Sequence, residues 1–114
     1  CTPGKRNELI QTKKLEIGLL EYLRGRNLED TFVLLDEAQN CSIHAVKTVI
    51  SRLESGSKVV IAGDTSQCDT GDNDNGLRFC VNKLANDPAV SVINFTQRDN
   101  VRNPRFNSVL SKFP

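Results

Sequence analysis

Two acidic residues, Asp36 and Glu37, directly follow the unbroken apolar and β-branched run Thr31–Leu35. A continuous run of this kind predicts a parallel strand that is covered on both faces. In open α/β sheets, the residues that do chemistry lie just past the carboxyl ends of the strands. One carboxylate of this pair could hold a divalent cation, and the other could polarise an attacking water.

A second group of polar residues follows the next apolar run. Lys58–Ala62 (KVVIA) predicts another buried strand, and Gly63-Asp64-Thr65-Ser66-Gln67 comes directly after it. Asp64 and Gln67 are therefore placed past a neighbouring strand, where they could orient water or read a γ-phosphate. A tight turn explains Gly63-Asp64 taken alone. Two such groups after successive strands favour a site for phosphoryl transfer.

The residues from Phe32 to Glu37 (FVLLDE) have the form of the Walker B motif of P-loop ATPases. In that motif the first carboxylate, here Asp36, lies near a magnesium ion that bridges the β- and γ-phosphates. The second, Glu37, acts as a general base on water. Ala38 and Gln39 complete a helicase-like DEAQ box, in which Gln39 senses phosphate or couples to other motifs. A surface turn is the alternative, because acidic residues are common there.

Helices and a further strand are predicted around these motifs. The apolar residues between Ser42 and Leu53 lie on one helical face, with Ser42 as the N-cap and Gly56 as the end signal. Gly76–Ala85 predicts a second helix, and Ala89–Phe95 (AVSVINF) predicts a third strand. Strands that alternate with helices of this length indicate an α/β fold, with a parallel β-sheet flanked by helices.

The composition is that of one globular domain. The chain has 114 residues, of which 38% are hydrophobic and 25% charged, and a net charge of +1 that argues neither for nor against nucleic-acid binding. It contains no apolar run near the roughly 20 residues that span a bilayer. The first six residues lack the apolar core of a signal peptide. The four cysteines form no CxxC pair, which indicates reduced thiols and a cytoplasmic protein.

Five segments of the chain resemble the PhoH-like (phosphate-starvation-inducible) P-loop ATPases. The family's usual forms are YMRGR, FIILDEAQN, GSK, GDxxQxD and DVVRHP, in the same order and with similar gaps. The match covers about residues 9–111, and FVLLDEAQN with the upstream LRGR is its most specific part. The corresponding segments here are Tyr22–Arg26, Phe32–Asn40, Gly56–Lys58, Gly63–Asp69 and Asp99–Pro104.

The resemblance implies a role for each residue that matches a family motif. Asp36 is implied as the magnesium-side carboxylate and Glu37 as the catalytic base. Gln67 and Asp64 are implied as the polar sensor after the next strand, and Gln39 as a contact to the nucleotide. Three arginines are implied as candidates for phosphate or inter-subunit contacts, because guanidinium stabilises charge that develops during phosphoryl transfer. They are Arg24, Arg26 and Arg102.

The same resemblance implies a partial P-loop NTPase fold of the RecA and helicase kind, with ATP and Mg²⁺ as cofactors. It implies that the intact protein is a ring-shaped homo-oligomer with a connection to RNA metabolism, and RNA is a candidate partner. Arg98, Arg102 and Arg105 could form a basic patch for RNA. No aromatic residues are interleaved with them, so stacking on bases is not indicated.

The chain lacks the family's Walker A loop, G-x-x-x-x-G-K-S/T. Gly4-Lys5 is no substitute, because Arg6 follows it and the earlier glycine is missing. The sequence also has no methionine. These absences predict that residues 9–114 are the C-terminal part of a PhoH-like ATPase domain whose phosphate loop lies in sequence outside this chain. Residues 1–8 are polar and contain Pro3 and Gly4, which predicts a polar tail or loop.

Two further departures and two alternatives remain. Asn103 stands where the family usually has His, and Asp69–Gly76 carries extra polar residues, which predicts a solvated loop. The first alternative is a catalytically degenerate module that keeps the fold and binds RNA or a partner ATPase. The second is a nucleic-acid-binding subunit of a complete ATPase, which would bind RNA in a salt-dependent manner.

Overall fold

The computed structural model describes residues 1–23, 25–67, 74–101, 108–109 and 111–113 of the chain. These residues belong to two compact units, Cys1–Leu84 and Ala85–Pro114, and each unit is described by itself. No helix among the described residues is long and apolar enough to span a bilayer.

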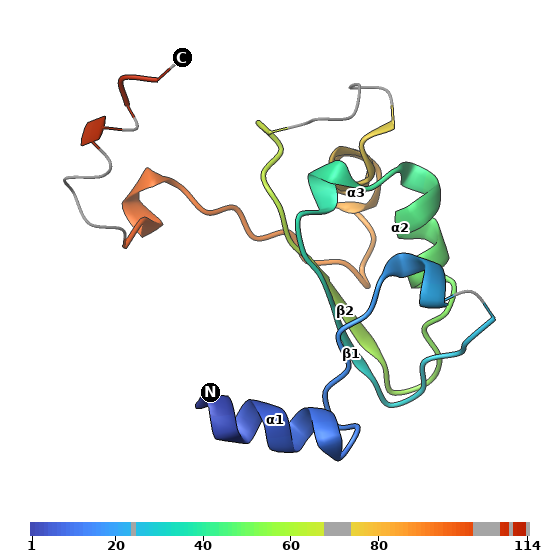
Figure 1. Ribbon diagram of the computed structural model, residues 1–114. Coiled ribbons are helices and arrows are strands. Elements are labelled where there is room, and N and C mark those ends of the chain that lie inside the picture. The colour runs from blue at the N-terminus through green and yellow to red at the C-terminus, as the bar shows by residue number, and fades with distance from the viewer. Residues whose placement is uncertain (24, 68–73, 102–107, 110, 114) are drawn as a thin grey trace. The chain divides into compact units, whose positions relative to one another are not determined.

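The first unit contains a parallel pair of strands, β1 (Phe32–Leu35) and β2 (Lys58–Ile61) (Figure 1). The register aligns Phe32 with Lys58 at one end and Leu35 with Ile61 at the other. A parallel pair needs a crossover, which α2 (Ile43–Ile50) provides. The α/β class, with a parallel sheet and flanking helices, is confirmed.

Two of the helices of this unit were predicted from the sequence. The Ser42 hydroxyl accepts a hydrogen bond from the Ala45 N–H at 3.0 Å, so the predicted N-cap of α2 is confirmed. The helix ends at Ile50, before the predicted end at Leu53, and Leu53 forms a parallel bridge with Leu28. The second predicted helix is α3, Gly76–Leu84.

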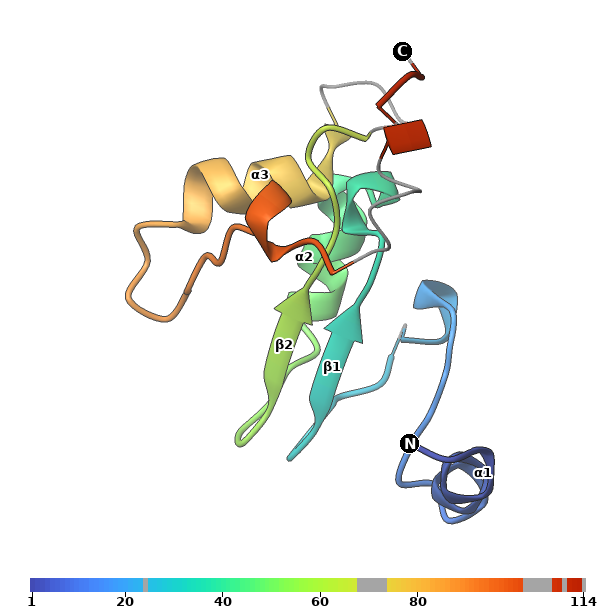
Figure 2. The same cartoon turned by 90° about the vertical axis from the view of Figure 1, so that its left-hand side faces the viewer.

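The hydrophobic core lies on one face of the sheet, against α2 and α3 (Figure 2). Side chains alternate along a strand, so only every second residue of each strand can reach these helices. The core consists of Leu35, Ala38, Val46, Val49 and Leu77, with Val33, Val59, Ile61, Cys80 and Val81 packed against it.

The opposite face of the sheet is exposed in this chain. Phe32 is 69% exposed and Leu34 61%, and Val60 beside them is also exposed. The prediction that this strand is covered on both faces is therefore wrong for the described residues. An apolar run identifies a strand with two apolar faces, but the number of layers that cover it depends on other parts of the structure.

The predicted third strand, Ala89–Phe95, is also wrong. This segment lies in the second unit, where Ala89 is in a turn and no strand is formed from Val90 to Phe95. Ile93 and Phe95 are 78% and 84% exposed. Apolar, β-branched composition favours extended backbone, but a strand requires a partner. The one helical turn described near it is η4, Gln97–Asp99.

The amino-terminal segment is helical and not the loop that was predicted. Helix α1 spans Pro3–Gln11, with Pro3 in its first turn and the Thr2 hydroxyl accepting from the Lys5 N–H at 3.3 Å. None of its residues is buried. Proline and a hydroxyl N-cap are helix-start signals, so the residues that suggested a turn begin a helix instead. A short turn, η1 (Leu20–Leu23), follows.

The Gly56-Ser57-Lys58 segment closes the amino ends of the two strands. The Ser57 hydroxyl donates to the Leu28 carbonyl at 2.7 Å and accepts from the Thr31 N–H at 3.0 Å. Gly56 has φ +76°, and a Cβ there would overlap the Asp30 carboxylate. This motif therefore has a structural role at the end of the sheet away from the acidic pair.

We predict that the same truncation destabilises the protein much more at Leu35 than at the adjacent Leu34. Leu35→Ala removes a side chain that is 9% exposed and should cost about 3 kcal/mol of unfolding free energy. Leu34→Ala, on the open face, should cost under about 1 kcal/mol. Urea denaturation of both variants measures the difference, and equal losses would mean that the second face is covered too.

Candidate active site

The two polar groups meet at the carboxyl ends of β1 and β2. Two backbone hydrogen bonds extend the contact beyond the strands: the Ala62 N–H donates to the Leu35 carbonyl, and the Ala38 N–H donates to the Ala62 carbonyl, both at 2.9 Å. Asp36 and Glu37 follow directly on one strand, and Asp64 follows on the other. The predicted proximity of the acidic pair and the sensor residues is thus produced by parallel pairing.

The side chain of Gln39 connects the acidic pair to the loop after β2. It lies in the turn η2 (Ala38–Asn40) and is only 2% exposed. Its Nε2 donates to Oε2 of Glu37 at 2.6 Å, and its Oε1 accepts from the Asp64 N–H at 3.1 Å. The two loops are therefore connected by one buried amide.

Gly63 is required here because of a close approach. A Cβ on Gly63 would overlap Oε1 of Gln39 and would lie 2.9 Å from Cδ2 of Leu77 and 3.1 Å from the Ala38 nitrogen. Its φ is not in the left-handed region. The tight-turn explanation of Gly63 is thus replaced by a packing one, since the missing side chain makes room for Gln39.

Glu37 has a strained backbone. Its φ of 53° and ψ of 37° are left-handed, a conformation that costs a non-glycine residue about 1–2 kcal/mol. The Glu37 N–H donates to Oδ1 of Asp36 at 2.9 Å, and both side chains are exposed. Strain of this kind is concentrated at functional sites, where surrounding contacts maintain it.

The Asp64 carboxylate organises the loop after β2. Its Oδ1 accepts from the Ser66 hydroxyl at 2.6 Å and the Ser66 N–H at 2.8 Å, and its Oδ2 accepts from Nε2 of Gln67 at 3.0 Å. These bonds, led by the one from the Ser66 hydroxyl, lower the pKa of Asp64 below its usual value. Asp64 therefore carries its negative charge to lower pH than an isolated aspartate.

Arg78 is a residue near the site that sequence reasoning missed. Its Nη2 donates to the Thr65 carbonyl at 3.0 Å, which connects α3 to the sensor loop. The Arg78 N–H donates to Oδ1 of Asn75 at 3.0 Å, as in an N-cap. The available signal was Asn75, a cap residue directly before a predicted helix.

The predicted solvated loop is packed at its end. Asn75 is buried, and Asp74 accepts from the Ile43 N–H at 2.9 Å. A Cβ on Gly76 would lie 2.9 Å from the Ser42 carbonyl oxygen and 3.0 Å from that of Cys41. The prediction of a solvated loop is thus wrong for Asn75 and Gly76, which are buried, whereas Asp74 is exposed. Contacts of these three residues hold the two helix starts together, and residues 68–73 lie outside the described part.

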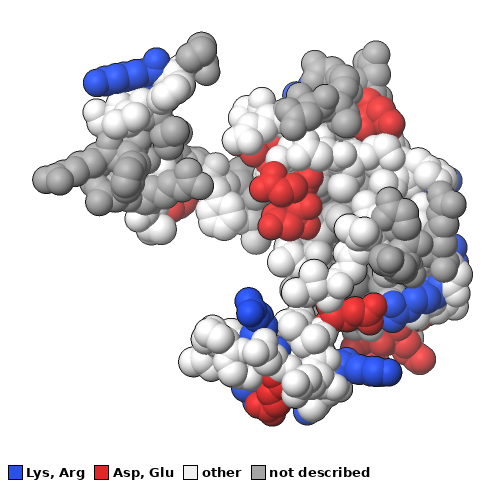
Figure 3. Space-filling model, in the orientation of Figure 1, with Lys and Arg blue, Asp and Glu red and all other residues white. Residues whose placement is uncertain are grey.

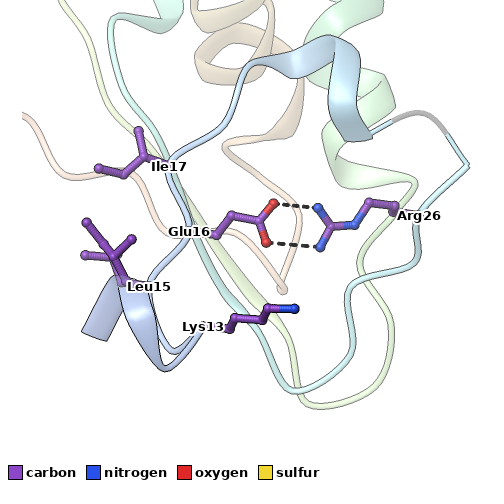
Figure 4. Close-up of a pocket in the computed structure, with 6 residues that line it drawn as sticks. Lys13, Leu15, Glu16, Ile17 and Arg26 are labelled. Carbon is purple, nitrogen blue, oxygen red and sulfur yellow. Dashed lines mark hydrogen bonds and ion pairs between the residues drawn. The ribbon is translucent and has the colours of Figure 1, made fainter. Parts of the chain in front are cut away.

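Arg26 pairs with a carboxylate that belongs to neither acidic motif. Its Nη1 and Nη2 donate to the two oxygens of Glu16 at 2.6 and 3.2 Å (Figure 4). This pairing lowers the pKa of Glu16 and raises that of Arg26, through the hydrogen bond first and charge second. The pair borders a hollow that shares no residue with the site around Glu37. Arg24 and Arg102 lie outside the described residues.

Asp36 and Glu37 suit a magnesium ion that has water and phosphates as its other ligands, and suit less well a metal ion held by protein side chains alone. Within the described residues, no three His, Cys, Asp or Glu side chains come together to hold a metal. Mg²⁺ commonly takes one or two carboxylates, with water and substrate phosphates as its other ligands. Asp36, an exposed carboxylate at the end of a strand, fits such a partial site.

Basic and acidic side chains are mixed on the face of the molecule drawn in Figure 3. On the face drawn in Figure 3, the basic side chains of the described residues are separated by acidic and uncharged ones. An extended basic stripe is the usual electrostatic mark of phosphate-backbone binding. This face carries none among the residues described.

Glu37 provides a direct test of backbone strain. Glu37→Gly and Glu37→Ala both remove the bond to Gln39, so they differ only in how well they accept a left-handed backbone. We expect the glycine variant to be the more stable by about 1 kcal/mol. At Lys47, exposed within α2, the order should be reversed by about 1 kcal/mol. Urea denaturation measures both pairs, and the same order at both positions would contradict the strained conformation.

Ser66→Ala should raise the pKa of Asp64 toward its usual value, because the largest cause of the shift is lost. In the wild type, the Asp64 carboxylate binds a proton more readily in the unfolded chain than in the folded one. The stabilising contribution of Asp64 is therefore present above the unfolded pKa and is lost as the pH falls through the lower, folded one. NMR titration of the aspartate carboxyl carbons measures the change. Asp99, whose pKa is lowered by Thr96, should stay unchanged as a control.

Comparison with known proteins identifies a single family. A family model described as "PhoH-like protein" matches residues 2–113. PhoH-like proteins from Mycobacterium tuberculosis and Bacillus subtilis are 36% and 37% identical to this chain over 107 and 106 residues. These matches cover 93% and 92% of the chain but only 30% and 33% of the relatives. The PhoH-like protein of a Synechocystis species is 34% identical over 112 residues, 97% of the chain and 34% of that protein. The chain thus spans about a third of the length of these relatives.

Proposed function

The chain belongs to the PhoH-like protein family, and from this premise we propose that it supplies the acidic and sensor motifs of an ATP-binding and hydrolysing P-loop domain. The observation that carries the proposal is the buried link between these motifs. Gln39 binds the Glu37 carboxylate and the Asp64 N–H at the carboxyl ends of two parallel strands. Nucleotide sites of open α/β sheets lie at this edge.

Asp36 and Glu37 divide the chemistry between them in this proposal. Asp36 would hold the magnesium ion, which would neutralise charge on the phosphates when the nucleotide is bound. Glu37 takes the proton from the attacking water. Gln39 binds its Oε2, so Oε1 is the atom proposed to accept that proton.

The sensor residues lie on the neighbouring loop. Gln67 is proposed to orient the water or read the γ-phosphate, and Asp64 to hold Gln67 in place through the bond between their side chains. Arg24, Arg26 and Arg102 are proposed for phosphate or inter-subunit contacts in a homo-oligomer. For Arg26, such a contact requires either that its ion pair with Glu16 breaks or that Glu16 also takes part in the contact.

A catalytically degenerate module is the second candidate function. An upstream reading frame without a phosphate loop would favour it, since no backbone nest, lysine or hydroxyl would then be present to hold the phosphates. Such a module would bind RNA or a partner ATPase. A phosphate-loop sequence encoded in frame upstream of the codon for Cys1 would decide in favour of the ATPase.

The 114-residue chain alone should not hydrolyse ATP at a useful rate, because it lacks the phosphate loop. The complete open reading frame that encodes it should show magnesium-dependent hydrolysis, measured as phosphate release. Glu37→Gln should lower this rate about 100-fold or more by removing the general base. Glu54→Gln, an exposed carboxylate distant in sequence from the site, is the control. If the 114-residue chain hydrolyses ATP and Glu37→Gln abolishes that activity, the first expectation is wrong. If Glu37→Gln in the complete reading frame keeps full activity, the second expectation is wrong.

A further inference from the structure

We propose that Gln39 is a positioning residue that fixes the catalytic carboxylate of Glu37 to the backbone of the sensor loop, and that it does not bind the nucleotide. The inference rests on the proposed function for the role of Glu37. It replaces the prediction from sequence that Gln39 contacts the nucleotide.

The first argument is that Gln39 is buried and both ends of its amide are bound to protein. At 2% exposure, the side chain presents almost no surface to a ligand. Its nitrogen donates to Glu37, and its oxygen accepts from the N–H of Asp64. The direction of the amide is set by chemistry, because a carboxylate only accepts and a backbone N–H only donates. A flipped amide would place oxygen against oxygen and N–H against N–H.

The second argument is the space around the amide. Oε1 of Gln39 occupies the volume that a side chain on Gly63 would need, and Ala38 beside it is fully buried. The glutamine is therefore held between two backbone segments and has little freedom to change rotamer. A side chain confined in this way can hold its hydrogen-bond partner in a fixed place.

The third argument concerns what is held. Glu37 is exposed and would otherwise sample several rotamers. The 2.6 Å bond from Gln39 selects one of them, on a left-handed backbone that already restricts the residue. A general base must lie within hydrogen-bond reach of the group whose proton it takes, about 2.6–3.2 Å between heavy atoms. Because the same amide binds the Asp64 N–H, a shift of the sensor loop also moves the base.

The kinetic test uses the complete open reading frame and two substitutions of Gln39. Gln39→Leu keeps the approximate shape but loses both hydrogen bonds. It should lower kcat about 100-fold, as expected for a displaced base, and leave KM within about 3-fold. Gln11→Leu, on the exposed helix α1, is the matched control and should leave both parameters unchanged. A large rise in KM with unchanged kcat would instead show contact with the nucleotide and overturn the proposal.

Gln39→Glu separates positioning from a merely structural role. Its carboxylate can still accept from the Asp64 N–H, but at neutral pH it repels Glu37. When protonated, it can donate to Glu37 as the amide does. The kcat of this variant relative to the wild type should therefore rise about 10-fold or more between pH 8 and pH 6. For Gln39→Leu the same ratio should stay flat, and parallel profiles for the two variants would overturn the proposal.

A measurement on the 114-residue chain does not depend on ATP hydrolysis. Hydrogen exchange of the Asp64 amide, followed by NMR, should become at least about 10-fold faster in Gln39→Leu and stay slow in Gln39→Glu. Unchanged exchange in Gln39→Leu would show that the link does not exist. If this exchange responds but the wild-type reading frame does not hydrolyse ATP, the proposed function fails and the link stands. If the wild type hydrolyses ATP and Gln39→Leu does so equally fast, the positioning role fails alone.

Discussion

Parallel pairing of β1 with β2 is the constraint on which the other features of the first unit depend. A parallel pair cannot be closed by a tight turn, so the chain must cross over through α2 before it returns. The same geometry brings the carboxyl ends of both strands to one edge. Residues that are 27 positions apart in sequence, Glu37 and Asp64, are thereby connected through one side chain. An antiparallel pair would have placed them at opposite ends.

Two glycines and one amide convert this proximity into a defined arrangement. Gly63 leaves the space that Gln39 occupies, and Gly76 lets the start of α3 approach the backbone before α2. Neither glycine is needed for a positive φ, unlike Gly56 at the other end of the sheet. The site is thus built by close backbone approach, with the strained Glu37 at its exposed side.

The two faces of the sheet differ in how far they are covered in this chain. The core faces α2 and α3, whereas the face that carries Phe32 and Leu34 is open in this chain. The relatives are about three times as long, and the chain matches only a third of each. The link between the two motifs does not involve the open face, because Gly63 lies against Gln39 and against Leu77 of the core.

The sequence by itself determined the α/β class, the two strands, helices α2 and α3 and the Ser42 cap, because each depends on local periodicity or a local hydrogen bond. It also placed the DEAQ and GDTSQ segments directly after neighbouring strands. It failed for helix α1, for the Ala89–Phe95 strand, for the covering of β1 on both faces and for the burial of Asn75 and Gly76, and the last three depend on partners distant in the chain. Only the tertiary structure decided that Arg26 pairs with Glu16 and that Gln39 is buried between two loops. Ion pairs and buried amides depend on which backbone segments approach within hydrogen-bond distance, and a sequence pattern does not contain that information.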